Sequence, residues 1–393
     1  MESLQKYALY LYCFSINFEQ WDPFNTGVDF LFTKITIVLY LLSSITDVKK
    51  LYSLKNIKIY IYPIVVFFVV LTYMSYSNRT ALYPDFFNVP FFLNLLVLII
   101  AINQSRKESQ ILLQCLFVFS ISSLVMTMMH FSGMESVSEL ENRVTIFGKN
   151  QNDLGLNLAI SMLIFVSIIY ENKMQLLRKK YLIIFSFPLL LIFLFRTGSR
   201  VAFISLLIGI IVFFLLKKTK IKGMKLIVLF VLTFLMFFIW ELYLKNTYIA
   251  ERLFTSIEQG DLSGRELLWA SSFEIITKNL LFGIGETGYA ITIEPILEYF
   301  SSPHNVIIEV LCYTGFFGLA IFMIFLIRII NCGIRSYIIK KDILPLLLLF
   351  PISGMILSGQ ILGTKIAWVV FAYIISSYIS TRVNKFSQIE NKI

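Results

Sequence analysis

Leu194–Gly209 reads LFRTGSRVAFISLLIG, two apolar runs separated by a short polar break that holds Arg196 and Arg200. Apolar runs of about 17–25 residues, the length that crosses a bilayer as an α-helix, recur from one end of the chain to the other. The break is therefore expected to be a short turn between two membrane helices. What the two arginines do then depends on which side of the membrane they face.

The composition places the chain among integral membrane proteins. Hydrophobic residues make up 58% of the chain and charged residues 15%, and the mean hydropathy is +0.79. A soluble protein of 393 residues needs far more polar surface. No small-residue cleavage site follows the first apolar run, so we expect a retained first helix. The four cysteines show no metal-binding spacing, and neither a metal nor another cofactor is expected.

The hydropathy pattern predicts an all-α, multi-pass membrane protein, a single polytopic domain over residues 1–393. Most of the charge lies in the segments between the expected helices. About twelve helices are expected, at residues 7–20, 28–46, 59–76, 86–103, 110–131, 153–170, 181–197, 200–216, 226–245, 304–327, 343–361 and 366–381.

The charges of the connecting segments alternate along the chain. One set carries most of the Lys and Arg and comprises both termini and the loops near 47–58, 104–109, 171–180, 217–225 and 332–342. The other set carries most of the Asp and Glu. Because basic loops stay in the cytoplasm, both termini are expected inside. The net charge of +10 then reflects membrane topology, and no basic stripe with interleaved aromatics indicates nucleic-acid binding.

Arg196 and Arg200 consequently face the outer side. Ser199 is a good N-cap for the helix that follows, and Arg200 occupies its first turn. A cation there opposes the helix dipole, unless an anion binds between the free N–H groups and the guanidinium. The alternative is an arginine that reaches for lipid phosphates, and both interpretations stay open on this motif alone.

The second outward-facing helix start contains His304. Ser302 is expected to cap the helix, with Pro303 at its first position and His304 and Asn305 in its first turn. A helix N-terminus disfavours the imidazolium, so His304 is expected to be neutral and able to accept a proton. His130 lies at an outer helix C-terminus, where the dipole favours the charged form. A hydrogen-bonded interfacial histidine is the alternative for His304.

A third outward-facing start lies in RVTIFGKNQNDLG, residues 143–155. Asn150, Asn152 and Asp153 crowd the expected helix start, which ordinary capping explains. Arg143 and Lys149 add positive charge nearby.

The outer loop at 246–303 is the one long polar segment, and loops of this length are usually functional. Residues 263–285 are expected to form an amphipathic helix on the membrane surface, opened by a Ser263–Glu266 capping box. Its apolar face carries one cation, and consists of Arg265, Leu268, Trp269, Ser272, Phe273 and Ile276. GIGETG at 283–288 is expected to be a tight turn and no dinucleotide site, since no βαβ unit surrounds it.

In this order and spacing, four motifs resemble those of the bacterial O-antigen ligase and O-antigen polymerase superfamily. They span about residues 140–320, and are RVTIFGKNQNDLG (143–155), GSRVAF (198–203), GRELLW with NLLFGIG (264–285) and HNVIIEVLCYTGFFG (304–318). The resemblance implies a GT-C-like fold and a metal-independent glycosyltransferase. It would move a glycan from undecaprenyl diphosphate to an acceptor hydroxyl, at the outer face of the bacterial cytoplasmic membrane.

The same resemblance implies roles for individual residues. Arg200 and Arg265 would bind the diphosphate, and His304 would be the catalytic base. The remaining outer positions are expected to contact the substrate, and are Arg196, Ser199, Arg143, Asn152, Asn305 and Trp269.

Three alternatives remain at this point. The family contains polymerases, which extend a lipid-linked glycan and work with a chain-length regulator, and ligases, which move the glycan onto lipid A–core. The outer loop carries little beyond the shared motifs and offers no obvious extra surface for a lipid A–core acceptor, which favours a polymerase. A flippase of lipid-linked sugars would show charges and Pro/Gly breaks near mid-membrane in two related halves, and the second half here does not repeat the first. A purely structural subunit would not need His304, Arg200 and Arg265 on one side.

Overall fold

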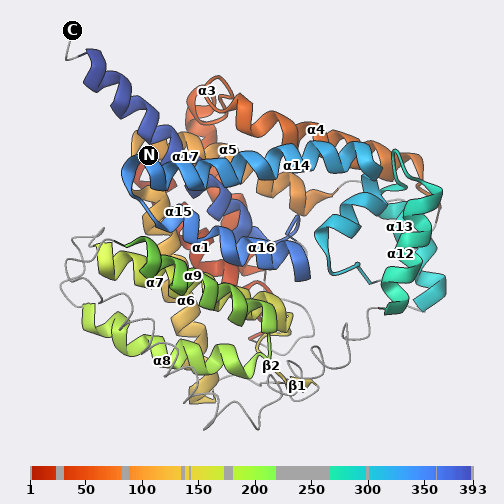
Figure 1. The fold of residues 1–393 in the computed structure, drawn as a ribbon, viewed down its shortest axis with the longest axis horizontal. Helices are drawn as coiled ribbons and strands as arrows, with labels where there is room; N and C mark the ends of the chain where they lie inside the picture. The colour runs from red at the N-terminus through yellow and green to blue at the C-terminus, as the bar shows by residue number, and fades with distance from the viewer. Residues whose placement is uncertain are drawn as a thin grey trace.

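The computed structural model describes residues 2–23, 31–81, 88–133, 138–140, 143–171, 180–217, 266–297, 301–359 and 361–390. Over these residues the protein is almost entirely helical, as its hydropathy predicts (Figure 1). The expected helix at 226–245, most of the outer loop and Arg265 lie outside the described residues. Each of the other expected helical segments coincides with a helix.

The described elements follow one another in the order of the sequence. They are α1 (Glu2–Ser15), η1 (Ile16–Phe18), α2 (Phe32–Ser44), η2 (Ile45–Asp47), α3 (Val48–Leu51), α4 (Lys58–Ser77), α5 (Val89–Lys107), α6 (Ile111–Ser132), β1 (Ser138–Leu140), β2 (Arg143–Thr145), α7 (Gln151–Glu171), α8 (Lys180–Arg196), α9 (Arg200–Leu216), α12 (Glu266–Lys278), α13 (Gly285–Leu297), α14 (Val306–Lys340), α15 (Leu344–Leu347), α16 (Leu349–Ser358) and α17 (Lys365–Glu390).

Within the described residues, five helices are long and apolar enough to cross a membrane: α4, α5, α6, α7 and α14. Shorter apolar stretches lie in α8, α9, α15–α16 and α17. Figure 1 shows α4 and α14 side by side along one edge and α7, α8 and α9 along the other, with α12 and α13 at one end. The antiparallel β1–β2 hairpin, which the sequence does not predict, leads into α7.

The sequence predicts a surface helix at 263–285, and the structure corrects this in two ways. The described helix α12 ends at Lys278, and α13 follows as a separate helix that was not predicted. Part of the expected lipid-facing stripe is buried in protein instead, since Leu268, Ser272 and Ile276 are at most 6% exposed, whereas Phe273 is 51% exposed. α12 contacts α13 and α14. Packing against these helices, instead of lipid, therefore explains its amphipathic pattern.

The helix expected at 304–327 begins at Val306, continues to Lys340 and is broken at Gly315. Gly315 has φ 61° and ψ −166°, which ends the first helical piece after Thr314. The break is held by backbone hydrogen bonds from Phe316 N to Leu280 O and from Phe317 N to Leu281 O. The NLLFGIG and CYTGFFG segments therefore interlock through their main chains.

This interlock leaves no room for a side chain at its glycines. A Cβ on Gly283, whose φ is +66°, would lie 2.6 Å from the backbone of residues 312–314, and one on Gly315 would collide with the backbone of Leu281. The tight turn expected at GIGETG is confirmed by positive φ angles at Gly283 and Gly285.

We expect Gly315→Ala to lower the thermal stability of the purified protein more than Gly133→Ala does. Both positions have positive φ, but Gly133 is in the left-handed region, which costs an L-residue about 1–2 kcal/mol, whereas the ψ of −166° puts Gly315 in a region that is essentially restricted to glycine. Only Gly315 adds a backbone collision, because nothing lies within 4 Å of a Cβ at Gly133. Melting curves of the two variants measure the difference, and equal losses would contradict the interlock.

Two cavities occupy opposite ends of the helices and agree with the assignment of the loops. One, of about 350 Å³, is lined only by segments assigned to the outer side, such as Gln20, Lys149 and His304. The other, of about 380 Å³, is lined by Ser109, Lys340 and other residues near the ends assigned to the cytoplasm. The loop residues that line each cavity therefore belong to a single one of the two charge sets.

Which of the two ends faces outward can be measured by cysteine labelling. We expect a membrane-impermeant maleimide added to intact cells to label Thr80→Cys and to spare Lys49→Cys, because both positions are exposed but belong to opposite sets of loops. The native cysteines Cys13, Cys115, Cys312 and Cys332 are buried and give little background. The reverse pattern would place Arg200 and His304 in the cytoplasm.

Candidate functional site

The cavity at the expected outer end contains His304 and is the candidate site. Its wall combines segments that are far apart in the sequence, and is formed by Ile16, Glu19, Gln20, Pro90, Lys149, Asn150, Asp153, Asn157, His304, Ser358, Gly359, Gly363, Thr364, Lys365 and Ile366. Its volume of about 350 Å³ lies within the usual range for small-ligand sites.

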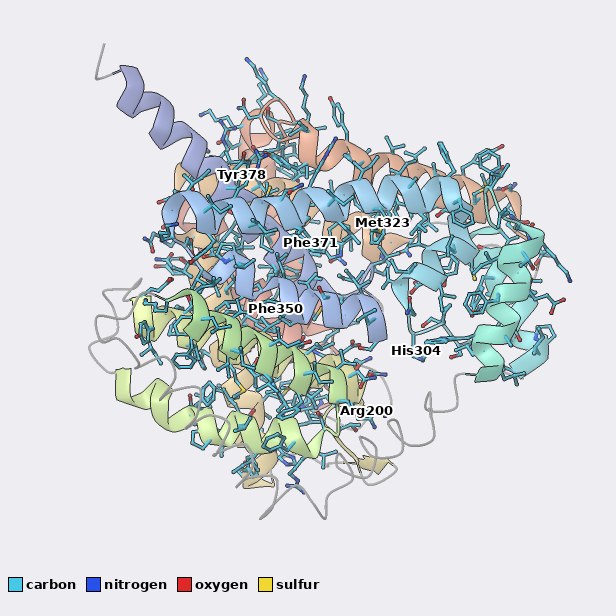
Figure 2. All side chains as sticks on the ribbon, viewed as in Figure 1. Arg200, His304, Met323, Phe350, Phe371 and Tyr378 are labelled. Carbon is cyan, nitrogen blue, oxygen red and sulfur yellow. The ribbon has the colours of Figure 1, made fainter. Side chains whose placement is uncertain are left out.

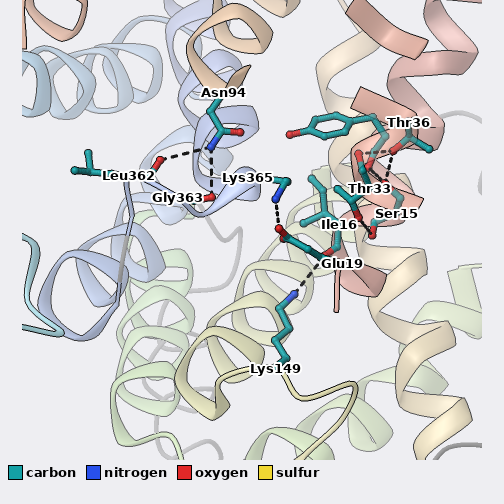
Figure 3. Close-up of polar contacts among 11 residues, drawn as sticks. Ser15, Ile16, Glu19, Thr33, Thr36, Asn94, Lys149, Leu362, Gly363 and Lys365 are labelled. Atoms are coloured by element: carbon teal, nitrogen blue, oxygen red, sulfur yellow. Dashed lines mark hydrogen bonds and ion pairs between the residues drawn. The ribbon is translucent and has the colours of Figure 1, made fainter. Parts of the chain in front are cut away.

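Two lysines and a glutamate form a charged network across this cavity. Lys365 forms an ion pair with Glu19, and the Nζ of Lys149 donates to the Ile16 carbonyl at 3.3 Å. Figure 3 shows Glu19 between the two lysines. Desolvation lowers the pKa of Lys149, while Glu19 and Asp153 act in the opposite direction. Both ammonium groups are thus engaged by the protein.

One turn of α7 supplies polar groups to the same wall. Asp153 and Asn157 are four residues apart, so they lie on one face of the helix. Asn157 is 1% exposed, and its Nδ2 donates to Asn17 Oδ1 at 3.1 Å. The helix start is capped, as expected, by Asn150, whose Oδ1 accepts from the Asn152 backbone N at 2.8 Å. Asn152 itself does not line the cavity.

His304 lies just before α14, which corrects the expected cap. Asn305 is the N-cap, since its Oδ1 accepts from the N–H groups of Ile307 at 3.0 Å and Ile308 at 3.3 Å. Ser302 is buried and does not cap the helix. His304 has φ 51°, a left-handed conformation that costs a non-glycine residue about 1–3 kcal/mol and is common at functional sites.

Trp269 of α12 helps to hold this strained segment in place. Its Nε1 donates to the Pro303 carbonyl at 2.9 Å, one residue before His304. The Trp269 side chain is half-buried against the protein core. Trp269 therefore ties the motif that contains Arg265 to the motif that contains His304.

The predicted helix start at Arg200 is confirmed. Ser199 accepts from the Ala202 N–H at 3.4 Å, and α9 begins at Arg200. Gly155 brings α7 close to this start, because a Cβ there would lie 2.8 Å from the Ser199 Cβ. Arg200 therefore lies at the same end of the helices as the cavity, although it does not line the cavity wall. Figure 2 labels both Arg200 and His304.

Arg196 has a contact that corrects the expected charge of His130. Its Nη1 lies 3.0 Å from Nε2 of His130, whose ring stacks on Phe193. A guanidinium can only donate, so Nε2 accepts and the imidazole is neutral. The protonated His130 expected from the helix dipole is therefore wrong. Arg196 is exposed and does not line the cavity.

Two of the expected site residues cannot be placed in full. Arg265 lies outside the described residues, and so does the Ser263–Glu266 capping box apart from the backbone of Glu266. Arg143 begins β2, which contacts α7, and its side chain is not described.

The sequence does not single out Glu19, Asn157 or Lys365 as site residues. The ion pair between Glu19 and Lys365 joins positions 346 residues apart, so no local pattern indicates it. Asn157 could have been found, because it lies one helical turn after Asp153.

Residues 185–323 match a protein-family model described as O-antigen ligase. The match contains three of the four motifs and ends before α15; RVTIFGKNQNDLG lies outside it. No curated protein matches the chain. The apolar helices and this match together identify a multi-pass membrane protein whose residues 185–323 are similar to the O-antigen ligase family, in agreement with the resemblance of its motifs.

Proposed function

We propose that this protein is a repeat-unit polymerase of a bacterial polysaccharide, acting at the outer face of the cytoplasmic membrane. It would have about twelve spans and a GT-C-like organisation, and would transfer a glycan from undecaprenyl diphosphate to a hydroxyl of an acceptor sugar. The observation that carries the proposal is the position of His304 in the wall of a polar cavity, at the end of the helices where α9 begins with Arg200.

The proposed reaction is a displacement at the anomeric carbon of the donor sugar. His304 takes the proton of the acceptor hydroxyl while its oxygen forms the new glycosidic bond. The bond between the anomeric carbon and the diphosphate breaks, and the lipid diphosphate leaves with the bonding electrons. Arg200 and Arg265 would stabilise the charge on this leaving group, the role that a metal ion has in other transferases. The donor's own diphosphate supplies the free energy, so no cofactor is required.

The other expected contacts are proposed at the positions that the fold gives them. Ser199 presents the N-terminus of α9, and Asn305 caps the helix that follows His304. Trp269 positions His304, whereas Arg196, Arg143 and Asn152 would be further contacts to the substrate. A chain-length regulator is the expected protein partner.

A polymerase is favoured over a ligase by the size of the cavity. A volume of about 350 Å³ suits a short stretch of glycan, and the sequence offers no large additional outer segment for a lipid A–core acceptor. The ligase remains the second candidate because the matching family model is described as O-antigen ligase.

Turnover by the purified protein tests these possibilities. The protein in liposomes would be given lipid-diphosphate-linked repeat units from the producing strain, with and without lipid A–core. A ladder of lipid-linked products indicates a polymerase, and glycan on lipid A–core indicates a ligase. Movement of the donor across the bilayer without a new glycosidic bond would overturn both in favour of a flippase.

A further inference from the structure

We infer that the cavity binds the acceptor sugar through its hydroxyl groups, with Asn157 Oδ1 and the Asp153 carboxylate as the hydrogen-bond acceptors that select it. This assignment rests on the proposed function and adds the position of one of its two substrates. It assigns substrate-binding roles to two residues of α7, separate from the arginines assigned to the diphosphate.

The orientation of the Asn157 amide is fixed by its neighbours. Asn17 Nδ2 must be a donor, because it faces the Phe119 carbonyl at 3.3 Å and the hydroxyls of Ser122 and Ser123 at 2.6 and 2.9 Å. Asn17 Oδ1 is then an acceptor, and the Nδ2 of Asn157 donates to it. The remaining atom, Asn157 Oδ1, is left for a different partner.

That Oδ1 atom is buried and receives no hydrogen bond from any described residue. Leaving a buried acceptor unpaired costs about 1–3 kcal/mol, so the site calls for a donor. Asn157 lines the cavity, and the hydroxyl of a sugar bound there can donate the missing hydrogen bond to its Oδ1.

Asp153 is one helical turn nearer the N-terminus of α7 and presents its carboxylate to the same cavity. Its Oδ1 approaches Gly359, where an added Cβ would lie 3.2 Å away. Within the described part of the chain, the carboxylate accepts no hydrogen bond. Two acceptors on one face of α7, spaced by four residues, suit a polyol that presents several hydroxyl groups.

The charges of the cavity argue against a phosphate group at this position. Lys365 is paired with Glu19, and Lys149 is held by the Ile16 carbonyl. Asp153 and Glu19 offset the two ammonium groups, so a diphosphate would bring further negative charge beside carboxylates. A neutral sugar needs no counter-charge and can place one hydroxyl toward His304 in the same wall.

Binding of soluble probes can separate this inference from the proposed function. The purified protein would be placed in phosphatidylcholine nanodiscs, which contain no sugar or glycerol headgroup. Glucose, galactose, N-acetylglucosamine and N-acetylgalactosamine would be titrated separately by saturation-transfer NMR, and inorganic pyrophosphate by ³¹P line broadening.

We expect at least one sugar to bind, and Asp153→Asn and Asn157→Leu each to weaken it about tenfold. Both variants should bind pyrophosphate as the native protein does. Asn103→Leu is the matched control: Asn103 is also a buried amide with an unpaired Oδ1, but it lies outside both cavities, at the opposite end of the helices. It should lower stability without changing sugar affinity.

Unchanged sugar affinity in Asp153→Asn and Asn157→Leu, or no binding of any of the four sugars, would overturn the inference. Weaker pyrophosphate binding in those variants would also overturn it, since the cavity would then hold the phosphates. If the sugar is lost in both variants while Arg200→Ala still binds pyrophosphate normally, the acceptor site stands and the diphosphate role of Arg200 fails.

Discussion

Replacing His304 with asparagine should slow glycan transfer by about 10²–10⁴-fold, the usual cost of losing a general base. Asparagine is chosen because His304 has φ 51°, and asparagine tolerates this left-handed conformation better than alanine does. The Asn305 cap and the Trp269 contact to Pro303 would both be preserved. Donor binding should stay normal, since the arginines are expected to supply it.

Single-turnover transfer, measured with the donor already bound, isolates the chemical step from donor affinity. His130→Ala is the comparison, because His130 already accepts from Arg196 and does not line the cavity. It should lower stability, by opening a hole beside Phe193, while transfer by each folded molecule remains close to normal. Near-native transfer by His304→Asn would show that another group is the base.

The starts of α9 and α14 show what the sequence can predict about helix boundaries and what it cannot. The start of α9 is predicted correctly because Ser199 is the one strong capping residue before an apolar run. The cap of α14 is predicted three residues too early, since Ser302 and Asn305 are both good caps and the sequence alone cannot choose. The Pro303 carbonyl accepts instead from Trp269 Nε1, a contact across 34 residues of sequence.

Other features depend on contacts that no local pattern encodes. The break at Gly315 lies inside a continuous apolar run, and only the backbone of residues 280–281 explains it. The cavity is likewise assembled from η1, α5, α7, α16 and α17 together with the segment before α14. Composition and periodicity could predict the helices and their grouping at two ends. They could not predict that Glu19 and Lys365 meet.

Replacing Arg200 with alanine should weaken binding of the lipid-diphosphate donor by roughly 10- to 150-fold, because a hydrogen bond to a charged group contributes about 1.5–3 kcal/mol. The start of α9 adds free N–H groups beside the guanidinium, so the loss should be at the upper end of this range. Arg200→Lys should recover only part of the affinity, since an ammonium cannot offer two parallel N–H donors to one phosphate.

The matched control is Arg79→Ala, because Arg79 is another arginine of the expected outer loops and stacks on Tyr76 at 3.6 Å. An arginine that only reaches for lipid phosphates should behave like Arg79, and its removal should leave donor binding unchanged. A competition titration, in which inorganic pyrophosphate displaces bound donor, separates the two roles in both variants. If Arg200 is part of a diphosphate site, Arg200→Ala should lower the affinity for pyrophosphate as well as the affinity for the donor. Equal donor affinity in Arg200→Ala, Arg79→Ala and the native protein would mean that Arg200 anchors α9 to the lipid headgroups, and that the leaving group is stabilised elsewhere.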